Sequence, residues 1–224
     1  SSVPDDRDIA LNNRGVALMG YFDYAGAVTV FDEAVSKRPD WLDARINLAI
    51  ALKNRQQRGD EQLALQELAQ VLASDPGNVR ANYVAGLLRL YLGEIEAAAD
   101  HFRRVVEADP VDAYAQYYLG QCQLRLGDRE AALAAYATAT ELDPYLRSAY
   151  YGAAQVLRQV QREQEASDQL ALFERMSANP RARLAEFKYT RMGPKSLALA
   201  VDDDTGATEV TALPGGALFA EPVE

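Results

Sequence analysis

Residues 111–144 read VDAYAQYYLGQCQLRLGDREAALAAYATATELDP and predict one hairpin of two helices. Gly127-Asp128 interrupts two amphipathic stretches, and Asp143-Pro144 closes the unit. Glycine is common just after a helix end, and aspartate is common just before a helix start. The residue before a proline is disfavoured in the helical region, whereas proline itself suits a first turn. The stretch is therefore a helix, a tight turn, a second helix and a stop.

The same stop recurs along the chain. Pro39, Pro76, Pro110 and Pro144 follow one another at spacings of 37, 34 and 34 residues. Two ladders of alanine keep the same phase, and both skip three residues in the second unit. The first ladder is Ala10, Ala44, Ala81, Ala115 and Ala149; the second is Ala27, Ala64, Ala98, Ala132 and Ala166. Self-similarity at this period is typical of a helical solenoid, and we expect the three extra residues in the turn near residues 55–59.

Bulky residues accompany the second ladder. Four positions after each alanine stand Phe31, Leu68, Phe102, Tyr136 and Leu170, and three further on stands another apolar residue. Offsets of 4 and 7 lie on one helical face. Small residues allow two helices to cross closely, and the bulky residues fill the space between one pair and the next. No single unit buries its apolar face alone, so the units must stack.

These units resemble tetratricopeptide repeats (TPRs) over residues 8–180. The resemblance rests on the alanines, the bulky positions, the prolines, and glycine or alanine at Gly15, Ala49, Gly86, Gly120 and Ala154. It implies an all-α protein, a right-handed α-solenoid of five TPR helix pairs. The pairs are expected at 8–39, 40–76, 77–110, 111–144 and 145–179. The amphipathic stretch at 182–192 is expected to form a C-terminal capping helix, because the last apolar face of a solenoid needs a cover.

Three regions follow from this pattern. Residues 1–7 form a frayed lead-in, 8–192 the solenoid with its capping helix, and 193–224 an extended or irregular tail. The tail is either a linker or a hairpin pairing Leu197–Val201 with Glu209–Leu213, since turn residues separate these two apolar runs. Asp202-Asp203-Asp204 lies in that turn. Three consecutive aspartates point in different directions, unlike the alternating ligands of a calcium loop, so we expect no metal site.

Composition narrows the class of partner. The net charge is −10 at pH 7, which repels phosphate backbones and anionic lipids, and we expect no nucleic-acid binding. No apolar stretch is long enough for a membrane span. The single cysteine, Cys122, is expected to be a small buried residue. Localisation stays open between cytoplasm and periplasm, because a leader removed before residue 1 would leave no trace.

Nothing in the pattern indicates catalysis or a cofactor. His101 is the only histidine, and no nucleophile or acid is placed by spacing to act with it. The sequence has no glycine-rich phosphate loop and no cluster of metal ligands. We therefore expect a non-catalytic protein without cofactors, with His101 on the surface.

The resemblance places the binding surface on the first helix of each pair, which lines the concave face in TPR proteins. Mapping that stripe onto this chain gives a tyrosine-rich groove. Tyrosine offers a large apolar face with little rotamer entropy to lose, and its hydroxyl can bond a peptide backbone. Arginine adds a fork for carboxylates. The expected peptide-binding residues are Asn13, Asn47, Arg80, Tyr83, Tyr91, Tyr114, Tyr117, Gln121, Arg125, Tyr151 and Arg158.

Several functions remain open at this point. TPR domains that hold the C-terminal carboxylate of chaperones use five clamp residues, and only Asn47 and Arg80 match here. The main expectation is a module that binds a peptide or partner protein in its groove. Two alternatives are the recognition or assembly arm of a larger, exported protein and a solenoid that self-associates into a homo-oligomer. The arm is suggested by residues 189–219, which resemble the junction between a bacterial TPR segment and an integrin-like β-propeller of the cartilage-acidic-protein type.

Overall fold

The computed structural model describes residues 4–201, and these residues fold into ten α-helices with no β-strand among them. The helices form five consecutive pairs. They are α1 (Asp6–Gly20), α2 (Tyr24–Lys37), α3 (Leu42–Arg55), α4 (Asp60–Ser74), α5 (Val79–Tyr91), α6 (Ile95–Ala108), α7 (Ala113–Leu126), α8 (Arg129–Leu142), α9 (Arg147–Gln159) and α10 (Glu163–Arg175). The all-α solenoid of five helix pairs is confirmed.

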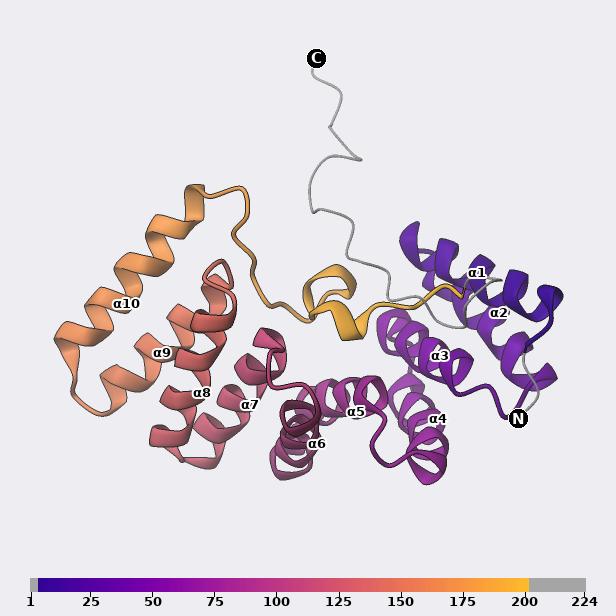
Figure 1. The fold of residues 1–224 in the computed structure, drawn as a ribbon, viewed down its shortest axis with the longest axis horizontal. Coiled ribbons are helices and arrows are strands. Elements are labelled where there is room, and N and C mark those ends of the chain that lie inside the picture. The colour runs from indigo at the N-terminus through magenta and orange to yellow at the C-terminus, as the bar shows by residue number, and fades with distance from the viewer. Residues whose placement is uncertain (1–3, 202–224) are drawn as a thin grey trace, which may run out of the picture.

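The pairs stack in chain order into an arch, with α1 and α2 at one end and α9 and α10 at the other (Figure 1). Each helix packs against the one before it and the one after it. Past α10 the chain turns back, and residues 180–201 cross the hollow between the two arms of the arch. The hollow side of the solenoid is therefore occupied by the protein's own chain.

Helix boundaries follow the local signals of the sequence. Asp128 accepts the backbone N–H of Ala131 at the start of α8, and Asp112 caps α7 in the same way at Ala115. These side chains satisfy N–H groups that have no partner inside the helix. Gly93 and Gly127 follow α5 and α7 with φ of 80° and 87°, a region that glycine enters at low cost. The turn and cap signals read from the sequence therefore act where expected.

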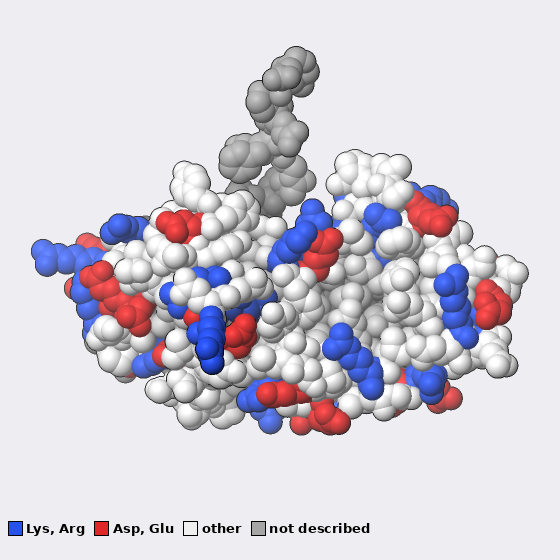
Figure 2. Space-filling view, turned by 180° about the vertical axis from the view of Figure 1, so that it is seen from behind, with Lys and Arg blue, Asp and Glu red and all other residues white. Residues whose placement is uncertain are grey.

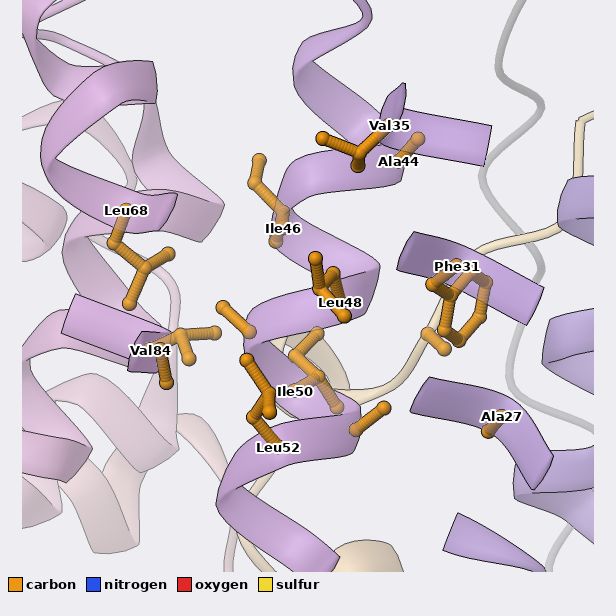
Figure 3. Close-up of a cluster of buried hydrophobic side chains, with 14 of the residues drawn as sticks. Ala27, Phe31, Val35, Ala44, Ile46, Leu48, Ile50, Leu52, Leu68 and Val84 are labelled. Carbon is orange, nitrogen blue, oxygen red and sulfur yellow. The ribbon is translucent and has the colours of Figure 1, made fainter. Parts of the chain in front are cut away.

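The ladders lie at the contacts between helices. All five alanines of the second ladder are buried, as are Phe31, Leu68, Phe102 and Tyr136. Figure 3 shows the arrangement around α3, with Phe31 of α2 on one side and Val84 of α5 on the other. A methyl group on Gly86 would lie 3.0 Å from the Phe102 ring, so only a minimal side chain fits at this crossing. Small-against-large packing thus joins each pair and its neighbour.

The expected capping helix at residues 182–192 is wrong. The stretch has no helix as far as Glu186, bends at Phe187 and Lys188, and then forms a single 3₁₀ turn, Tyr189–Arg191. Its backbone finds partners outside itself, because Arg183 N donates to Tyr145 O and Arg147 N donates to Arg183 O. Phe187 and Tyr189 are two residues apart, a spacing that suits an extended chain better than one helical face. Leu170 and Phe173 on α10 consequently remain half-buried.

Only the first part of the expected tail, residues 193–201, lies within the described residues. Residues 197–201 are extended, after a 3₁₀ turn at Pro194–Ser196. The second half of the hairpin considered above, residues 209–213, lies outside the described residues. On the face shown in Figure 2, Lys and Arg residues are interspersed with Asp and Glu residues, with no large area of one sign.

Candidate functional site

Residues 185–201, here called the groove segment, run along the inner face of the arch from the fifth pair towards the first. The segment begins where Ala185 N donates to Ser148 Oγ of α9, at 2.9 Å. It ends where Val201 meets Asn13 of α1. Between these points it contacts α7, α5 and α3 in turn. The odd-numbered helices therefore line the concave face and hold a peptide-like segment.

Two asparagines bind the extended end of the groove segment through its backbone. Asn47 Nδ2 donates to Leu199 O at 2.9 Å, and Leu199 N donates to Asn47 Oδ1 at 3.0 Å. Asn13 repeats this pair of bonds with Val201, at 2.8 and 2.9 Å. Asn13 and Asn47 occupy the same position in consecutive units, and the residues that they bind are two apart. An amide that pairs with both N–H and C=O satisfies an extended chain as a neighbouring strand would.

Asn47 is the centre of a buried polar network. Its Nδ2 also donates to Asn12 Oδ1 at 2.9 Å, and its Oδ1 also accepts from Arg80 at 3.1 Å. Arg80 in turn donates to Leu197 O at 3.0 Å and forms an ion pair with Asp43 at 3.1 Å. Asn47 is fully buried, yet both of its polar atoms are satisfied. Networks of this kind hold a defined geometry, because each member would be costly to leave unpaired.

The middle of the groove holds Met192 and Gly193. Met192 is fully buried, and its carbonyl accepts a 2.5 Å hydrogen bond from the Tyr83 hydroxyl. Burial raises the pKa of Tyr83 well above its usual value, so this hydroxyl stays protonated and keeps donating. Gly193 has φ of 97° and lies against Tyr83 and Tyr114. This part of the groove fits the segment closely around one glycine.

Aromatic rings hold the turn that precedes Met192. Phe187 lies beside Tyr118 and Tyr91, with ring centroids 6.0 and 6.1 Å apart. Tyr189 meets Tyr24 edge to face at 6.1 Å, and its hydroxyl accepts the N–H of Ala198. Edge-to-face pairs at these separations are favourable beyond the area they bury. The turn is thereby packed between the first and fourth helix pairs.

Lys53 lies under the same turn and has no acidic partner among residues 4–201. Its ammonium contacts the Met192 sulfur and lies 5.4 Å from the centre of the Phe187 ring. The residue is 7% exposed, and desolvation lowers the pKa of Lys53 to about 8. Burying an ammonium with only soft partners is costly. The groove segment therefore binds despite covering this charge.

A second lysine has the opposite environment. Lys195 of the groove segment places Nζ 2.5 Å from Asp109 Oδ2 and 2.7 Å from Asp112 Oδ2. Both aspartates belong to the loop between α6 and α7, and their hydrogen bonds raise the pKa of Lys195 although its desolvation opposes them. A cavity of about 520 Å³ opens beside this contact, bordered also by Tyr114 and Arg183. The loop thus offers a built site for one basic side chain.

The expected site residues divide into two groups. Asn13, Asn47, Arg80 and Tyr83 bond the groove segment, while Tyr91 and Tyr114 pack against it. A second group forms no hydrogen bond with residues 185–201 in the described chain: Tyr117, Gln121, Arg125, Tyr151 and Arg158. Tyr117 accepts a bond from Gln121 at 2.6 Å, whereas Arg125, Tyr151 and Arg158 are exposed.

Cys122 and His101 lie outside the groove, and the structure places both of them. Cys122 is buried as expected, and burial raises its pKa to about 12. The expectation that His101 is a free surface residue is wrong, because its Nδ1 lies 2.9 Å from Asn82 Oδ1 in a half-buried site. Desolvation lowers the pKa of His101, so it stays neutral at pH 7. Its contact with Asn82 joins α6 to α5.

The sequence did not reveal the acidic loop or the occupant of the groove. Asp109 is the residue before a boundary proline, a position that already has a structural explanation. Asp112 caps a helix. The sequence pattern divides the groove segment between an expected capping helix, up to residue 192, and an irregular tail after it, so it did not indicate one extended segment. One signal in the sequence could have indicated an extended ligand: Lys195 is a basic residue followed by small and apolar residues.

The arrangement of stacked antiparallel helix pairs around a concave face defines a helical-repeat solenoid, the class of protein that holds other chains on its inner surface. Residues 83–147 match the family model described as tetratricopeptide repeat. These matched residues are tetratricopeptide repeats, and the helix pairs on either side continue the same solenoid fold, which is a scaffold for protein–protein interaction.

Solved structures with the same fold include several of MamA. The structure titled "MamA 41-end from Desulfovibrio magneticus RS-1" has a TM-score of 0.71 and 21% identity, covering 80% of this chain and 99% of that one. A MamA double-mutant structure gives a TM-score of 0.70, 21% identity and coverage of 78% and 96%. A third, "Crystal structure of MamA", gives 0.65, 20%, 72% and 93%. At these identities the likeness shows a common fold.

A comparison with curated protein sequences finds no match. Among residues 4–201, no helix is long and apolar enough to cross a membrane. The same residues contain no group of three or more His, Cys, Asp or Glu side chains that could hold a metal ion.

Proposed function

We propose that this protein is a non-catalytic module whose concave groove binds an extended peptide through its backbone, and that the groove segment is its resident ligand. One observation carries the proposal: Asn13 and Asn47 each pair with both backbone groups of one residue, at Val201 and Leu199. Backbone pairing gives affinity, and pockets for side chains give specificity, as in other modes of strand recognition.

The polar side chains of the groove support this function more strongly than its many tyrosines do. Tyr83 and Tyr114 are 0% and 8% exposed, and their rings pack between helices while their edges face the groove segment. Asn13, Asn47 and Arg80 form five hydrogen bonds with backbone atoms of the groove segment: they donate three, and two are donated by the N–H groups of Leu199 and Val201. The recognition surface is therefore a row of amide and guanidinium groups on a wall of packed tyrosines.

The resident segment has a large statistical advantage over any other ligand. It is attached to α10, so its effective concentration at the groove is on the order of millimolar for a short flexible connection. An external peptide must overcome that advantage or wait until the segment opens. The groove thus binds its own chain by default, and partners are expected to act by displacement.

The test is to cut the connection and ask whether the segment stays bound. A specific protease site is inserted between Asn179 and Pro180, an exposed turn after α10, and the intact protein is cleaved there. We expect the C-terminal fragment to co-elute with the solenoid and to dissociate with a measurable Kd on dilution. Asn13→Ala with Asn47→Ala should weaken retention by at least about tenfold, because polar backbone groups would lose their partners.

A matched control uses Asn54→Ala, which removes an asparagine of α3 that bonds only Ile50 O of its own helix. This variant should retain the fragment as the parent protein does. Immediate loss of the fragment from the cut parent protein would refute the proposal.

A second role follows from the path of the same segment. Val201 is tied to Asn13 on the first helix, at the far end of the solenoid from α10. In this role the solenoid would be the arm of a larger protein. Its groove would hold the chain that continues after residue 201 beside the first helix pair. Energy transfer between labels at Lys37→Cys and Asp204→Cys tests this role, since the buried Cys122 does not compete for label. High transfer that is lost in the Asn13→Ala, Asn47→Ala variant supports it, and transfer unchanged by these substitutions contradicts it.

A further inference from the structure

We infer that the groove recognises a sequence and not only an extended backbone: a buried apolar residue, a glycine, any residue, a basic residue, and small residues at the first and third positions after it. In the groove segment these are Met192, Gly193, Lys195, Ser196 and Ala198. This inference rests on the proposed function and names its partners as peptides that carry this pattern.

The glycine requirement is steric as well as conformational. With φ of 97°, Gly193 adopts a backbone geometry that other residues rarely enter. A methyl group there would also overlap the Tyr83 hydroxyl and lie 2.9 Å from Tyr114 Cγ. Both rings are buried in the solenoid and have little room to move. Position 193 therefore excludes every side chain.

The basic residue is read by two carboxylates of the solenoid. Lys195 Nζ lies within 2.7 Å of an oxygen of Asp109 and of Asp112. The Asp112 side chain is 5% exposed, so its charge is expensive to leave without a cation. One residue, Pro194, separates the glycine from the lysine, a spacing set by the distance between Tyr83 and the acidic loop.

The small residues follow from the depth of the groove. Ser196 is 2% exposed, and its hydroxyl turns back to Gly193 O at 2.6 Å. Ala198 is 7% exposed with its N–H on the Tyr189 hydroxyl. Leu197 and Leu199 alternate with them and are only half-buried. Larger side chains at 196 or 198 would separate the segment from the helices that bond it.

Competition on the cut protein tests the pattern. The resident fragment is labelled with a fluorophore at its C-terminal end, and synthetic peptides of residues 185–201 are added in excess. We expect the parent peptide to displace the fragment. The Gly193→Ala peptide should compete about ten- to a hundredfold less well, which is the cost of overpacking a rigid site. Lys195→Met should lose about tenfold or more, and Lys195→Arg much less.

Two controls separate recognition from general damage. Lys188→Ala changes a side chain that is 72% exposed, and its peptide should compete like the parent. Asp109→Asn in the solenoid should weaken the parent peptide but change little further with the Lys195→Met peptide, because the pair acts as one interaction. Equal competition by parent, Gly193→Ala and Lys195→Met peptides would overturn the inference and leave the proposed function intact. Loss of the fragment on cleavage would instead refute the proposed function.

Discussion

The ammonium of Lys53 lies 5.4 Å from the centre of the Phe187 ring, and no carboxylate of the described residues is bonded to it. Phe187 belongs to the groove segment and Lys53 to α3, so closing the segment over the groove desolvates a charge. The groove is therefore held shut by backbone and aromatic contacts against an electrostatic cost, and this balance can be measured.

Replacing Lys53 by methionine should hold the groove segment more tightly. The substitution keeps most of the volume and removes the buried charge, which often stabilises a protein by about 1–2 kcal/mol or more. Hydrogen exchange of the Leu199 and Val201 amides reports the opening, because both bond to asparagine side chains. Lys37→Met is the control, since Lys37 is exposed and pairs only with Glu33. Faster exchange in Lys53→Met would show that the ammonium contributes to binding.

The same lysine predicts a pH dependence. Its pKa is about 8 with the groove closed and 10.5 in an exposed reference state, so closure releases a proton between these values. Stability of the closed state should rise as pH increases from 8 to about 9.5, by about 1.5 kcal/mol at most, and gain nothing below pH 7. Hydrogen exchange of the Leu199 and Val201 amides, corrected for the pH dependence of the intrinsic exchange rate, measures this rise in stability. The rise should disappear in Lys53→Met, and a rise of equal size there would assign it to another group.

The Tyr83 hydroxyl should contribute separately from its ring. Tyr83→Phe keeps the packing against Phe102 and Tyr118 but removes the donor to Met192 O. The cost should be about 1–2 kcal/mol in the opening of the segment, with little change in the helical circular dichroism. Tyr136→Phe is a suitable control, because that ring is buried against Gly120 and Gly152, away from the segment. Equal effects of the two variants would mean that the hydroxyl has no special role in the groove.

Replacing a glycine by alanine should destabilise the protein at a helix crossing but not at an open position. Gly152→Ala would bring a methyl group to 2.6 Å from Tyr136 Cζ, so we expect a net loss of about 1–2 kcal/mol after the gain in helix propensity. Gly20→Ala meets nothing within 4 Å and should be neutral or slightly stabilising. Denaturant midpoints compare the two. A Gly152→Ala variant as stable as the parent would show that the crossing can widen.

Cys122 should serve as an internal probe of unfolding. Burial raises its pKa to about 12, so almost no thiolate exists at pH 8 and the sulfur is also inaccessible. Thiol reagents should label the native protein far more slowly than the denatured protein. Labelling of the folded protein at the rate of a free thiol would indicate that the α7–α8 pair opens locally.

The local elements of this protein are determined by short-range signals. Gly127-Asp128 ends one helix and caps the next through the Asp128 bond to Ala131, whatever the rest of the chain does. The alanine and bulky positions predict close crossings because their spacing fits one helical face. Such features depend on backbone sterics and on side chains within one or two turns, and these can be read along the chain.

The groove could be predicted only in part. Asn13, Asn47, Arg80 and Tyr83 stand out because they fall on the inner stripe of successive first helices. Tyr151 and Arg158 fall on the same stripe, yet the segment leaves α9 at Ser148 and does not reach them. Nothing in a periodic pattern states where a second segment enters or leaves the groove.

The sequence alone determined that five helix pairs form, where the turns between the pairs fall and which faces pack, because propensity, capping and periodicity are local; the start of α1 at Asp6, inside the expected lead-in of residues 1–7, is an exception. Tertiary structure alone decided that residues 182–192 form no α-helix and that residues 185–201 fill the groove. The reason is that their backbone bonds go to Tyr145, Arg147, Asn47 and Asn13, groups that are distant in the chain and become available only when five units have stacked.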